Sequence, residues 1–127
     1  MIHGLHHVSL KCRERAVYDK ARDFYCRVLG LSVYREWETG MLIDTGTGYV
    51  EIFCNGEGET RQGAVRHLAL ACDNVDETAE AVRAAGYEIF VEPKDVVLPS
   101  DPPVRARVAF CRGALSEEIE FFDEKKG

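Results

Sequence analysis

The chain has 127 residues, of which 46% are hydrophobic and 30% are charged, values that fit one globular domain or two very small ones. Its formal net charge of −6 argues against nucleic acid and acidic membrane surfaces as partners, because phosphate binding needs a basic surface. No apolar run could span a bilayer, no export signal opens the chain, and the five cysteines lack CxxC spacing, so we expect a cytoplasmic protein with reduced thiols.

The first half of the chain has the order β-α-β-β-β. Residues 5–12 alternate in side-chain character as a strand does. Residues 13–18 form either a charged connection or a first helical turn, and the apolar spacing of residues 19–29 predicts a helix that ends at Gly30. Three further strands are expected at residues 31–37, 41–45 and 49–54.

The second half has the same order. Residues 65–72 predict a strand, and Asp73 or Asn74 is expected to cap a helix that ends at Gly86. The prolines of residues 92–103 predict a loop, which is either a rigid surface loop or a mobile lid. Three further strands are expected at residues 87–91, 104–111 and 117–123.

The two halves also repeat individual residues. His7 recurs as His67 and Cys12 recurs as Cys72, in each case 60 residues later. A period close to half of the chain indicates repeated modules. We therefore predict an α+β fold of two tandem βαβββ modules, which form a cupped mixed β-sheet with the helices outside. Residues 1–127 are then a single domain, with module one at about 1–56, a linker at about 55–63 and module two at about 64–127.

Strand alternation places four side chains away from the helices. His7 and His67 point away from the strand face that packs on the helix, because their neighbours on the other face are apolar. The same rule applies to Glu51 and Glu120 in the last strand of each module. If the two sheets combine into one curved surface, these side chains converge. Two imidazoles and two carboxylates would then form a divalent metal site, which is catalytic if it keeps open coordination positions.

Each of these residues also has an ordinary structural explanation. A single histidine on a strand is more often a hydrogen-bonded structural residue, and a glutamate on an edge strand is usually solvated. The recurrence of both residue types at equivalent positions favours the metal site. His3 and His6 have no counterpart in the second half, although a one-residue slip of the first strand would exchange His6 with His7.

Six segments together carry a resemblance to a known family. They are His7 in LHHVSL, FYCRVLGL at residues 24–31, Glu51 in YVEIF, His67 in RHLAL, VRAAGYEI at residues 82–89 and Glu120 in EIEFFD. The chain resembles the vicinal oxygen chelate superfamily, which contains glyoxalases, bleomycin-resistance proteins and dioxygenases. The resemblance covers almost the whole chain and implies paired βαβββ modules around a metal ion. One departure is the turn at residues 111–117, which lacks the Asp-Pro-Asp-Gly-type sequence of many members.

Within this superfamily, the residue at position 51 separates the branches. Glyoxalase I enzymes supply His, Glu, His and Glu, whereas extradiol dioxygenases and fosfomycin-modifying transferases lack the first carboxylate. Epimerases usually carry a glutamine there, and bleomycin-resistance proteins lack the metal ligands. The chain is therefore most similar to glyoxalase I (lactoylglutathione lyase). This resemblance implies a metal held by His7, Glu51, His67 and Glu120.

The resemblance also implies a reaction. A metal-dependent isomerase or lyase of this type transfers a proton through a metal-stabilised enediolate on a small 2-oxoaldehyde thiol adduct. Glu120 is the expected principal base, and Glu51 is its counterpart across the substrate. The implied metal is nickel or cobalt for a short chain, or zinc, and the residue types accept any of these. Glutathione or another thiol would be the co-substrate, and we expect a homodimer.

Three side chains are expected to line a substrate pocket. Lys11 shares the predicted ligand face of its strand, where it either meets an anionic substrate or lies in water at the rim. Phe53 and Phe122 share the ligand faces of theirs, where they either form the pocket wall or belong to the core. Four further side chains are candidates for binding an acidic thiol, with a surface role as the stronger expectation: Trp37, Arg35, Arg105 and Arg107.

Three functions remain open from the sequence. The first is a glyoxalase I-type enzyme that acts on a small molecule. The second is another enzyme on this scaffold, such as an epimerase or a thiol-transferring resistance enzyme. The third is a binding protein that sequesters a small molecule without a metal. The fold alone does not determine the activity, so an observation has to separate these functions. Bound metal would exclude the third function, because that function needs no metal.

Overall fold

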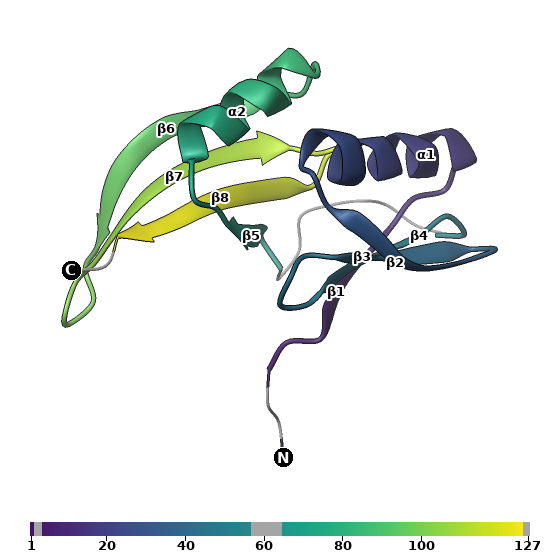
Figure 1. The fold of residues 1–127 in the computed structure, drawn as a ribbon, viewed down its shortest axis with the longest axis horizontal. Helices are drawn as coiled ribbons and strands as arrows, with labels where there is room; N and C mark the ends of the chain where they lie inside the picture. The colour runs from purple at the N-terminus through teal and green to yellow at the C-terminus, as the bar shows by residue number, and fades with distance from the viewer. Residues whose placement is uncertain (2–3, 57–64, 126–127) are drawn as a thin grey trace. The chain divides into compact units, whose positions relative to one another are not determined.

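The computed structural model describes residues 1, 4–56 and 65–125. The chain divides into two compact units, Met1–Arg61 and Gln62–Gly127. In the described ranges, each unit contains one four-stranded mixed sheet with an α-helix across one face (Figure 1). The predicted α+β fold of two βαβββ modules is confirmed.

The first unit follows the predicted order of elements. Its sheet has the strand order β1-β4-β3-β2, in which β1 pairs with β4 in parallel and the other pairs are antiparallel. The parallel pair brings the first and last strands of the module together. The elements are β1 (His7–Lys11), α1 (Arg15–Asp23), the π-helix η1 (Phe24–Val28), β2 (Ser32–Trp37), β3 (Gly40–Asp44) and β4 (Tyr49–Phe53).

The first helix begins earlier than its apolar spacing indicates. For residues 13–18 the sequence predicts either a charged connection or a first helical turn. The structure shows the helical turn, because α1 begins at Arg15 with Glu14 as N-cap. The helix then widens into η1, where the Leu29 N–H donates to the Phe24 carbonyl at 3.0 Å, five residues back. Gly30 follows with φ +78°, so the predicted glycine end of the helix is confirmed.

The core of the first unit is built from fully apolar faces. The helical segment contributes residues that recur every three or four positions, and β3 and β4 contribute alternate residues. Complete burial of such a side chain contributes about 1.5–3 kcal/mol. The buried hydrophobic residues of these elements are Tyr18, Ala21, Phe24, Tyr25, Met41, Ile43, Val50 and Ile52.

The second unit repeats this topology. Its sheet has the order β5-β8-β7-β6, with β5 parallel to β8 and the other pairs antiparallel. Asn74 caps α2 by accepting from the Glu77 N–H at 3.1 Å, and Gly86 ends the helix region with φ +92°. The elements are β5 (Leu68–Ala71), α2 (Val75–Ala84), β6 (Ile89–Leu98), β7 (Val104–Arg112) and β8 (Glu118–Lys125).

One predicted loop is wrong. Residues 92–98 belong to β6, which continues through Pro93 to Leu98, so only residues 99–103 connect β6 to β7. β6 is an edge strand, where a proline removes no hydrogen bond that the sheet needs, and the register with β7 shifts between Val91 and Lys94. A mobile lid over residues 93–103 is therefore excluded for the part that forms the strand.

The expected linker and the first strand of the second unit lie at or near the residues that the structure does not describe. Most of the predicted linker at residues 55–63 lies outside the described residues. The strand expected at residues 65–72 is shorter than predicted, because β5 begins at Leu68 and His67 immediately precedes it. Among the residues that the structure describes, no helix has the length and hydropathy needed to cross a membrane.

Candidate functional site

His7 and Glu51 form a pair on the first sheet. The parallel register of β1 and β4 sets Val8 beside Val50 and Ser9 beside Glu51. Val50 is buried on the core face, so Glu51 extends from the other face of the sheet. His7 reaches it diagonally, with His7 Nε2 at 3.5 Å from Glu51 Oε1.

His67 and Glu120 form the corresponding pair in the second unit. Glu120 lies in β8 between the buried residues Ile119 and Phe121, and its register partner in β5 is Ala69. His67 stands just before β5, and its Nε2 atom is 3.2 Å from Glu120 Oε1. The repeat therefore extends from the sequence to a side-chain contact made by each unit.

The two pairs also match in exposure. The side chain of Glu51 is 15% exposed and that of His7 is 39% exposed. The corresponding values are 14% for Glu120 and 38% for His67. Both carboxylates are thus largely shielded from water while both imidazoles remain accessible. Partly shielded carboxylates beside accessible imidazoles suit ligand binding better than a purely solvated role does.

The neighbours that hold each histidine differ between the units. The Nδ1 atoms of His6 and His7 lie 2.9 Å apart, and the His6 ring packs on Tyr49 at 5.2 Å between centroids. In the second unit the edge of the His67 ring packs against Phe110 at 5.3 Å. The contact of His6 was not foreseen, because repeat analysis favours residues that recur. The sequence does place His6 directly before His7, and this adjacency could have indicated the contact.

A hollow of about 500 Å³ lies beside the first pair. Lys11 and Phe53 are register partners on β1 and β4, and the turn after β4 closes the hollow. The Gly56 N–H donates to the Cys12 carbonyl at 3.0 Å. A Cβ added to Gly56 would lie 2.8 Å from the Cβ of Lys11, so a larger residue at position 56 would displace the lysine. The lining residues are Ser9, Leu10, Lys11, Phe53, Asn55 and Gly56.

The second unit lacks an equivalent lysine. Phe122 is the register partner of Ala71, as Phe53 is the partner of Lys11. Phe122 is partly exposed but does not line the hollow beside the first pair. The repeat is therefore symmetric in its His–Glu pairs and asymmetric in charge next to them, which gives the two units different surroundings for a ligand.

Three of the four other candidate binders, Arg107, Arg35 and Trp37, make intramolecular contacts. Arg107 contacts Asp76 of α2 at 2.6 Å and Asp95 of β6 at 3.1 Å, so its guanidinium is engaged by two carboxylates. Arg35 lies over the ring of Tyr34 at 4.7 Å, and the Trp37 ring packs against Phe53 with centroids 5.8 Å apart. Arg105 is exposed on β7. Trp37 therefore contacts a residue that lines the hollow.

The donor atoms fit a divalent metal ion, but each unit supplies only part of a ligand set. Imidazole nitrogen together with carboxylate oxygen suits borderline cations such as nickel, cobalt and zinc. Within residues 1, 4–56 and 65–125, no group of three or more His, Cys, Asp or Glu side chains is placed to hold a metal ion. Each His–Glu pair therefore offers two donors.

Comparison with known proteins identifies the family. The family model described as glyoxalase/bleomycin resistance protein/dioxygenase superfamily matches residues 4–99, which is more than half of the chain. The chain belongs to this superfamily. The predicted resemblance to the vicinal oxygen chelate superfamily is confirmed. No curated protein matches the chain.

Solved structures of glyoxalase-superfamily proteins share the fold. A protein titled glyoxalase/bleomycin resistance protein/dioxygenase from Alicyclobacillus acidocaldarius is 14% identical, with a TM-score of 0.71 over 97% of this chain and 92% of that one. A proposed glyoxalase family protein from Bacillus anthracis is 20% identical, with a TM-score of 0.75 over 98% of each chain. A lactoylglutathione lyase from Agrobacterium tumefaciens is 17% identical, with a TM-score of 0.67 over 94% and 92%. At these identities the likeness supports the fold alone.

Proposed function

We propose that the protein is a metal-dependent isomerase or lyase of the glyoxalase I type, acting on a small 2-oxoaldehyde thiol adduct. The observation that carries the proposal is the pair of matched contacts, His7 with Glu51 and His67 with Glu120, at equivalent positions and with equal exposure. A carboxylate in the first pair separates the glyoxalase I branch from branches that lack it. Superfamily membership is compatible with this assignment, and a structural neighbour named lactoylglutathione lyase shares the fold.

The four side chains would act together on one divalent metal ion, nickel, cobalt or zinc. When bound, the metal would supply a Lewis acid that polarises two neighbouring oxygens of the substrate. His7 and His67 would hold it through their Nε2 atoms, which are the atoms that face Glu51 and Glu120. The two pairs would come from one chain or from two copies of it.

Glu120 and Glu51 would carry the proton. The Glu120 carboxylate takes the proton from the carbon that bears the hydroxyl and sulfur, and the proton returns to the neighbouring carbon, with Glu51 as the counterpart on the other side. Both carboxylates are at most 15% exposed, so few water molecules compete for the proton during the transfer. The substrate configuration would decide which glutamate acts first.

The hollow beside Glu51 would bind the thiol part of the substrate. Lys11 offers a cation, Asn55 offers an amide and Phe53 offers an apolar wall. An anionic thiol such as glutathione has carboxylates for the first two groups and an aliphatic stem for the third. The asymmetry between Lys11 and Ala71 would place the thiol part of the substrate at the first unit.

A homodimer in the cytoplasm fits this function. Both sheets end in edge strands, β1 and β2 in one and β5 and β6 in the other. Edge strands expose unpaired backbone groups, which proteins commonly cover with another chain or segment. We therefore expect two copies to associate, and the free thiols of all five cysteines suit a reducing compartment.

Metal analysis together with an activity assay tests the proposal. The protein, purified after metal-replete expression, should contain a divalent ion and isomerise the adduct of methylglyoxal and glutathione. Glu120→Gln and Glu51→Gln should each lower kcat at least about a hundredfold, as removal of a general base does. Glu118→Gln is the matched control, because Glu118 lies two residues away on β8 and pairs with Arg112 at 3.3 Å. Bound metal without turnover of this adduct would favour another enzyme of the superfamily, and absence of metal would contradict the proposal.

A further inference from the structure

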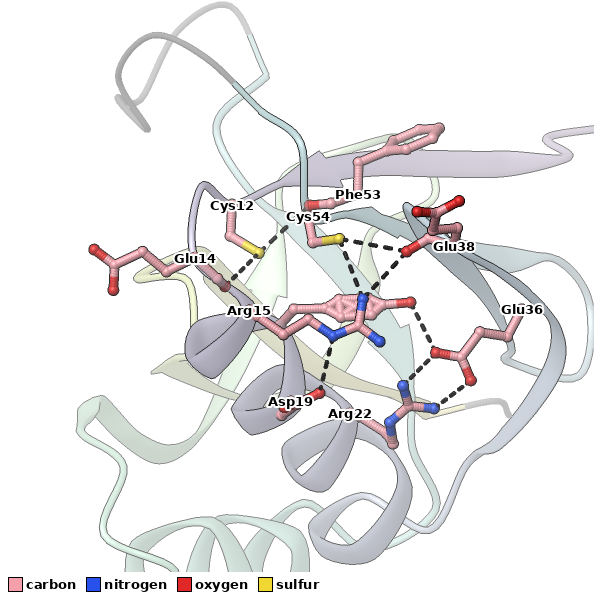
Figure 2. A network of polar contacts seen from close by, with 10 residues as sticks. Cys12, Glu14, Arg15, Asp19, Arg22, Glu36, Glu38, Phe53 and Cys54 are labelled. Carbon is pink, nitrogen blue, oxygen red and sulfur yellow. Dashed lines mark hydrogen bonds and ion pairs between the residues drawn. The ribbon is translucent and has the colours of Figure 1, made fainter.

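A second group of reactive side chains lies at the ends of β1 and β4. Cys12 and Cys54 each follow a register-paired residue, because Lys11 is the partner of Phe53 and the Cys12 N–H donates to the Phe53 carbonyl at 2.8 Å. Figure 2 shows both cysteine side chains extending from the strands toward α1. Both cysteines lie one residue past this last register pair. Paired strands lie about 4.8 Å apart, which is within the Cα separation of about 4.4–6.8 Å that a disulfide needs.

The two thiols differ in accessibility. Cys12 is 6% exposed, and its Sγ atom contacts the Phe53 carbonyl at 3.4 Å. Burial raises the pKa of the Cys12 thiol, and the charge of a Cys54 thiolate raises it further. Cys54 is partly exposed. An oxidant would therefore reach Cys54 first and leave Cys12 as the protected second thiol.

Arg15 is fixed against the accessible thiol. Its Nη1 atom is 3.5 Å from Cys54 Sγ and donates to the Glu38 carbonyl at 3.2 Å (Figure 2). The guanidinium also lies over the Tyr18 ring at 4.6 Å and contacts Asp19 at 3.7 Å. A guanidinium held in this way stabilises the negative charge that sulfur carries as it attacks an oxidant.

The repeat provides an internal comparison. Cys72 occupies the position of Cys12 in the second unit, and its Sγ contacts Thr78 Oγ1 at 3.2 Å. The residue that follows Phe122, at the position of Cys54, is Asp123, which pairs with Lys125 at 2.6 Å. The second unit therefore keeps a cysteine at this position, where it is partly exposed, but among the described residues it has Asp123 in place of the second thiol. The dithiol is a feature of the first unit and not a consequence of the repeated fold.

We propose that Cys54 and Cys12 form a dithiol site that hydroperoxides oxidise reversibly. The Cys54 sulfur attacks a peroxide oxygen and the O–O bond breaks. With hydrogen peroxide, the thiol proton leaves with the departing oxygen as water, and Cys54 becomes a sulfenic acid. The Cys12 sulfur then attacks the Cys54 sulfur, the S–O bond breaks, and a second water carries away the Cys12 proton. One peroxide is reduced by two electrons while two thiols become one disulfide.

Oxidation at this site would alter the hollow. Asn55 and Gly56, which line it, directly follow Cys54, and the Gly56 N–H is bonded to the Cys12 carbonyl. Trp37, the single tryptophan of the chain, packs on Phe53, the residue before Cys54. Fluorescence of Trp37 thus reports the oxidation state without any assay of activity, and this readout does not depend on the proposed enzymatic function.

Mass spectrometry of the full chain tests the site. After brief treatment with hydrogen peroxide and alkylation of the remaining thiols under denaturing conditions, the chain should carry three alkyl groups and lack the two thiol hydrogens of the disulfide, whereas the untreated chain should carry five alkyl groups. Peptide mapping should assign a Cys12–Cys54 disulfide that dithiothreitol reverses. Trp37 fluorescence should change in step with this mass. Cys12→Ala should stop at a sulfenic acid on Cys54 that dimedone traps, and Cys54→Ala should leave Cys12 reduced.

Matched variants separate this chemistry from general damage. Cys72→Ala should still form the disulfide, and Cys111 should stay reduced, because burial raises the pKa of its thiol to about 12. Arg15→Met should slow Cys54 oxidation at least fivefold, whereas Arg13→Met should not. Oxidation of Cys26 or Cys72 at the same rate as Cys54 would overturn the proposal. So would a Cys54 sulfenic acid that persists in the chain with Cys12 intact.

Discussion

The contact between His6 and His7 bears on the nitrogen that His7 would offer to the proposed metal. Their Nδ1 atoms are 2.9 Å apart, so one of them carries the shared proton. If His7 donates it, the Nε2 lone pair of His7 points toward Glu51, as a metal ligand requires. His6 would then be a positioning residue that fixes the tautomer of His7 and the orientation of its ring.

Substitution of His6 tests this role. His6→Phe removes the acceptor and should weaken divalent metal binding about 10- to 100-fold, as loss of such a supporting contact does. His6→Asn places an amide oxygen near the former Nδ1 position and should restore most of the affinity. Isothermal titration with nickel or zinc measures the effect, and nitrogen NMR of His7 reports its tautomer. Equal affinity of wild type and His6→Phe would show that His6 is only a neighbour.

Lys11 is predicted to select anionic substrates. Gly56 packs on its aliphatic stem and holds the side chain at the hollow. Because a hydrogen bond to a charged group contributes about 1.5–3 kcal/mol, Lys11→Met should raise KM for a glutathione adduct about tenfold or more and leave kcat nearly unchanged. Lys94→Met is the charge-matched control, because the Lys94 side chain is exposed on β6. An unchanged KM would place Lys11 in the solvent at the rim.

At the scale of elements, the two helices end in the same way. Gly30 and Gly86 have φ values of +78° and +92°, and a Cβ on either would meet no atom within 4 Å. Alanine at these positions therefore costs only backbone strain, about 1–2 kcal/mol. Urea unfolding should show a similar loss for Gly30→Ala and Gly86→Ala and a smaller one for the asparagine variants. A loss confined to one of the two positions would contradict the equivalence of the helix ends.

A charged contact ties α1 to β2. Arg22 donates to Glu36 at 2.7 Å and the Tyr18 hydroxyl donates to it at 3.0 Å. The hydrogen bonds from Arg22 lower the pKa of Glu36 below its usual value of 4.5. The folded state thus favours the carboxylate, so the stabilisation is present above about pH 4.5 and is lost as the pH falls through the lowered pKa.

Replacement of Glu36 by glutamine should show this dependence. Both side chains of the ion pair are 33% exposed, so solvent screening limits the loss to about 1 kcal/mol at neutral pH. The free energies of unfolding of wild type and Glu36→Gln should converge in acid. Denaturant titrations over a pH series measure the difference. A difference that stays constant down to acid pH would mean that packing, and not charge, carries the effect.

Sequence periodicity predicts most elements and fails where tertiary position decides. The repeated β-α-β-β-β order, a cap at Asp73 or Asn74 and both terminal glycines follow from local chemistry, and the structure selects Asn74. The early start at Arg15 does not, because polar residues in the first turn hide the apolar spacing. The strand through Pro93 depends on β6 being an edge strand, which only the sheet order reveals.

At the scale of the whole chain, repetition carries more information than any single motif. The 60-residue offset relates His7 to His67, and the matching last strands of the two modules relate Glu51 to Glu120. Each unit brings its own pair within 3.5 Å. The residues that sequence reasoning missed, His6, Asn55 and Gly56, do not recur in the second half. Their placement depends on one turn and one ring contact, which local patterns do not encode.

Metal binding is predicted to need both units at once. A metal ion at a hundredfold excess over its Kd should raise the free energy of unfolding by about 2.7 kcal/mol, and a chelator should reverse the effect. His7→Ala and His67→Ala should each abolish most of this gain, because either one leaves at most three of the four donors. Each should leave the metal-free stability nearly unchanged, since both side chains are more than a third exposed. Thermal unfolding of each variant and of the wild type, with and without nickel, measures both the metal-dependent gain and the metal-free stability. A gain that survives one of the two substitutions would mean that a single His–Glu pair holds the metal, and the proposed four-ligand centre would be wrong.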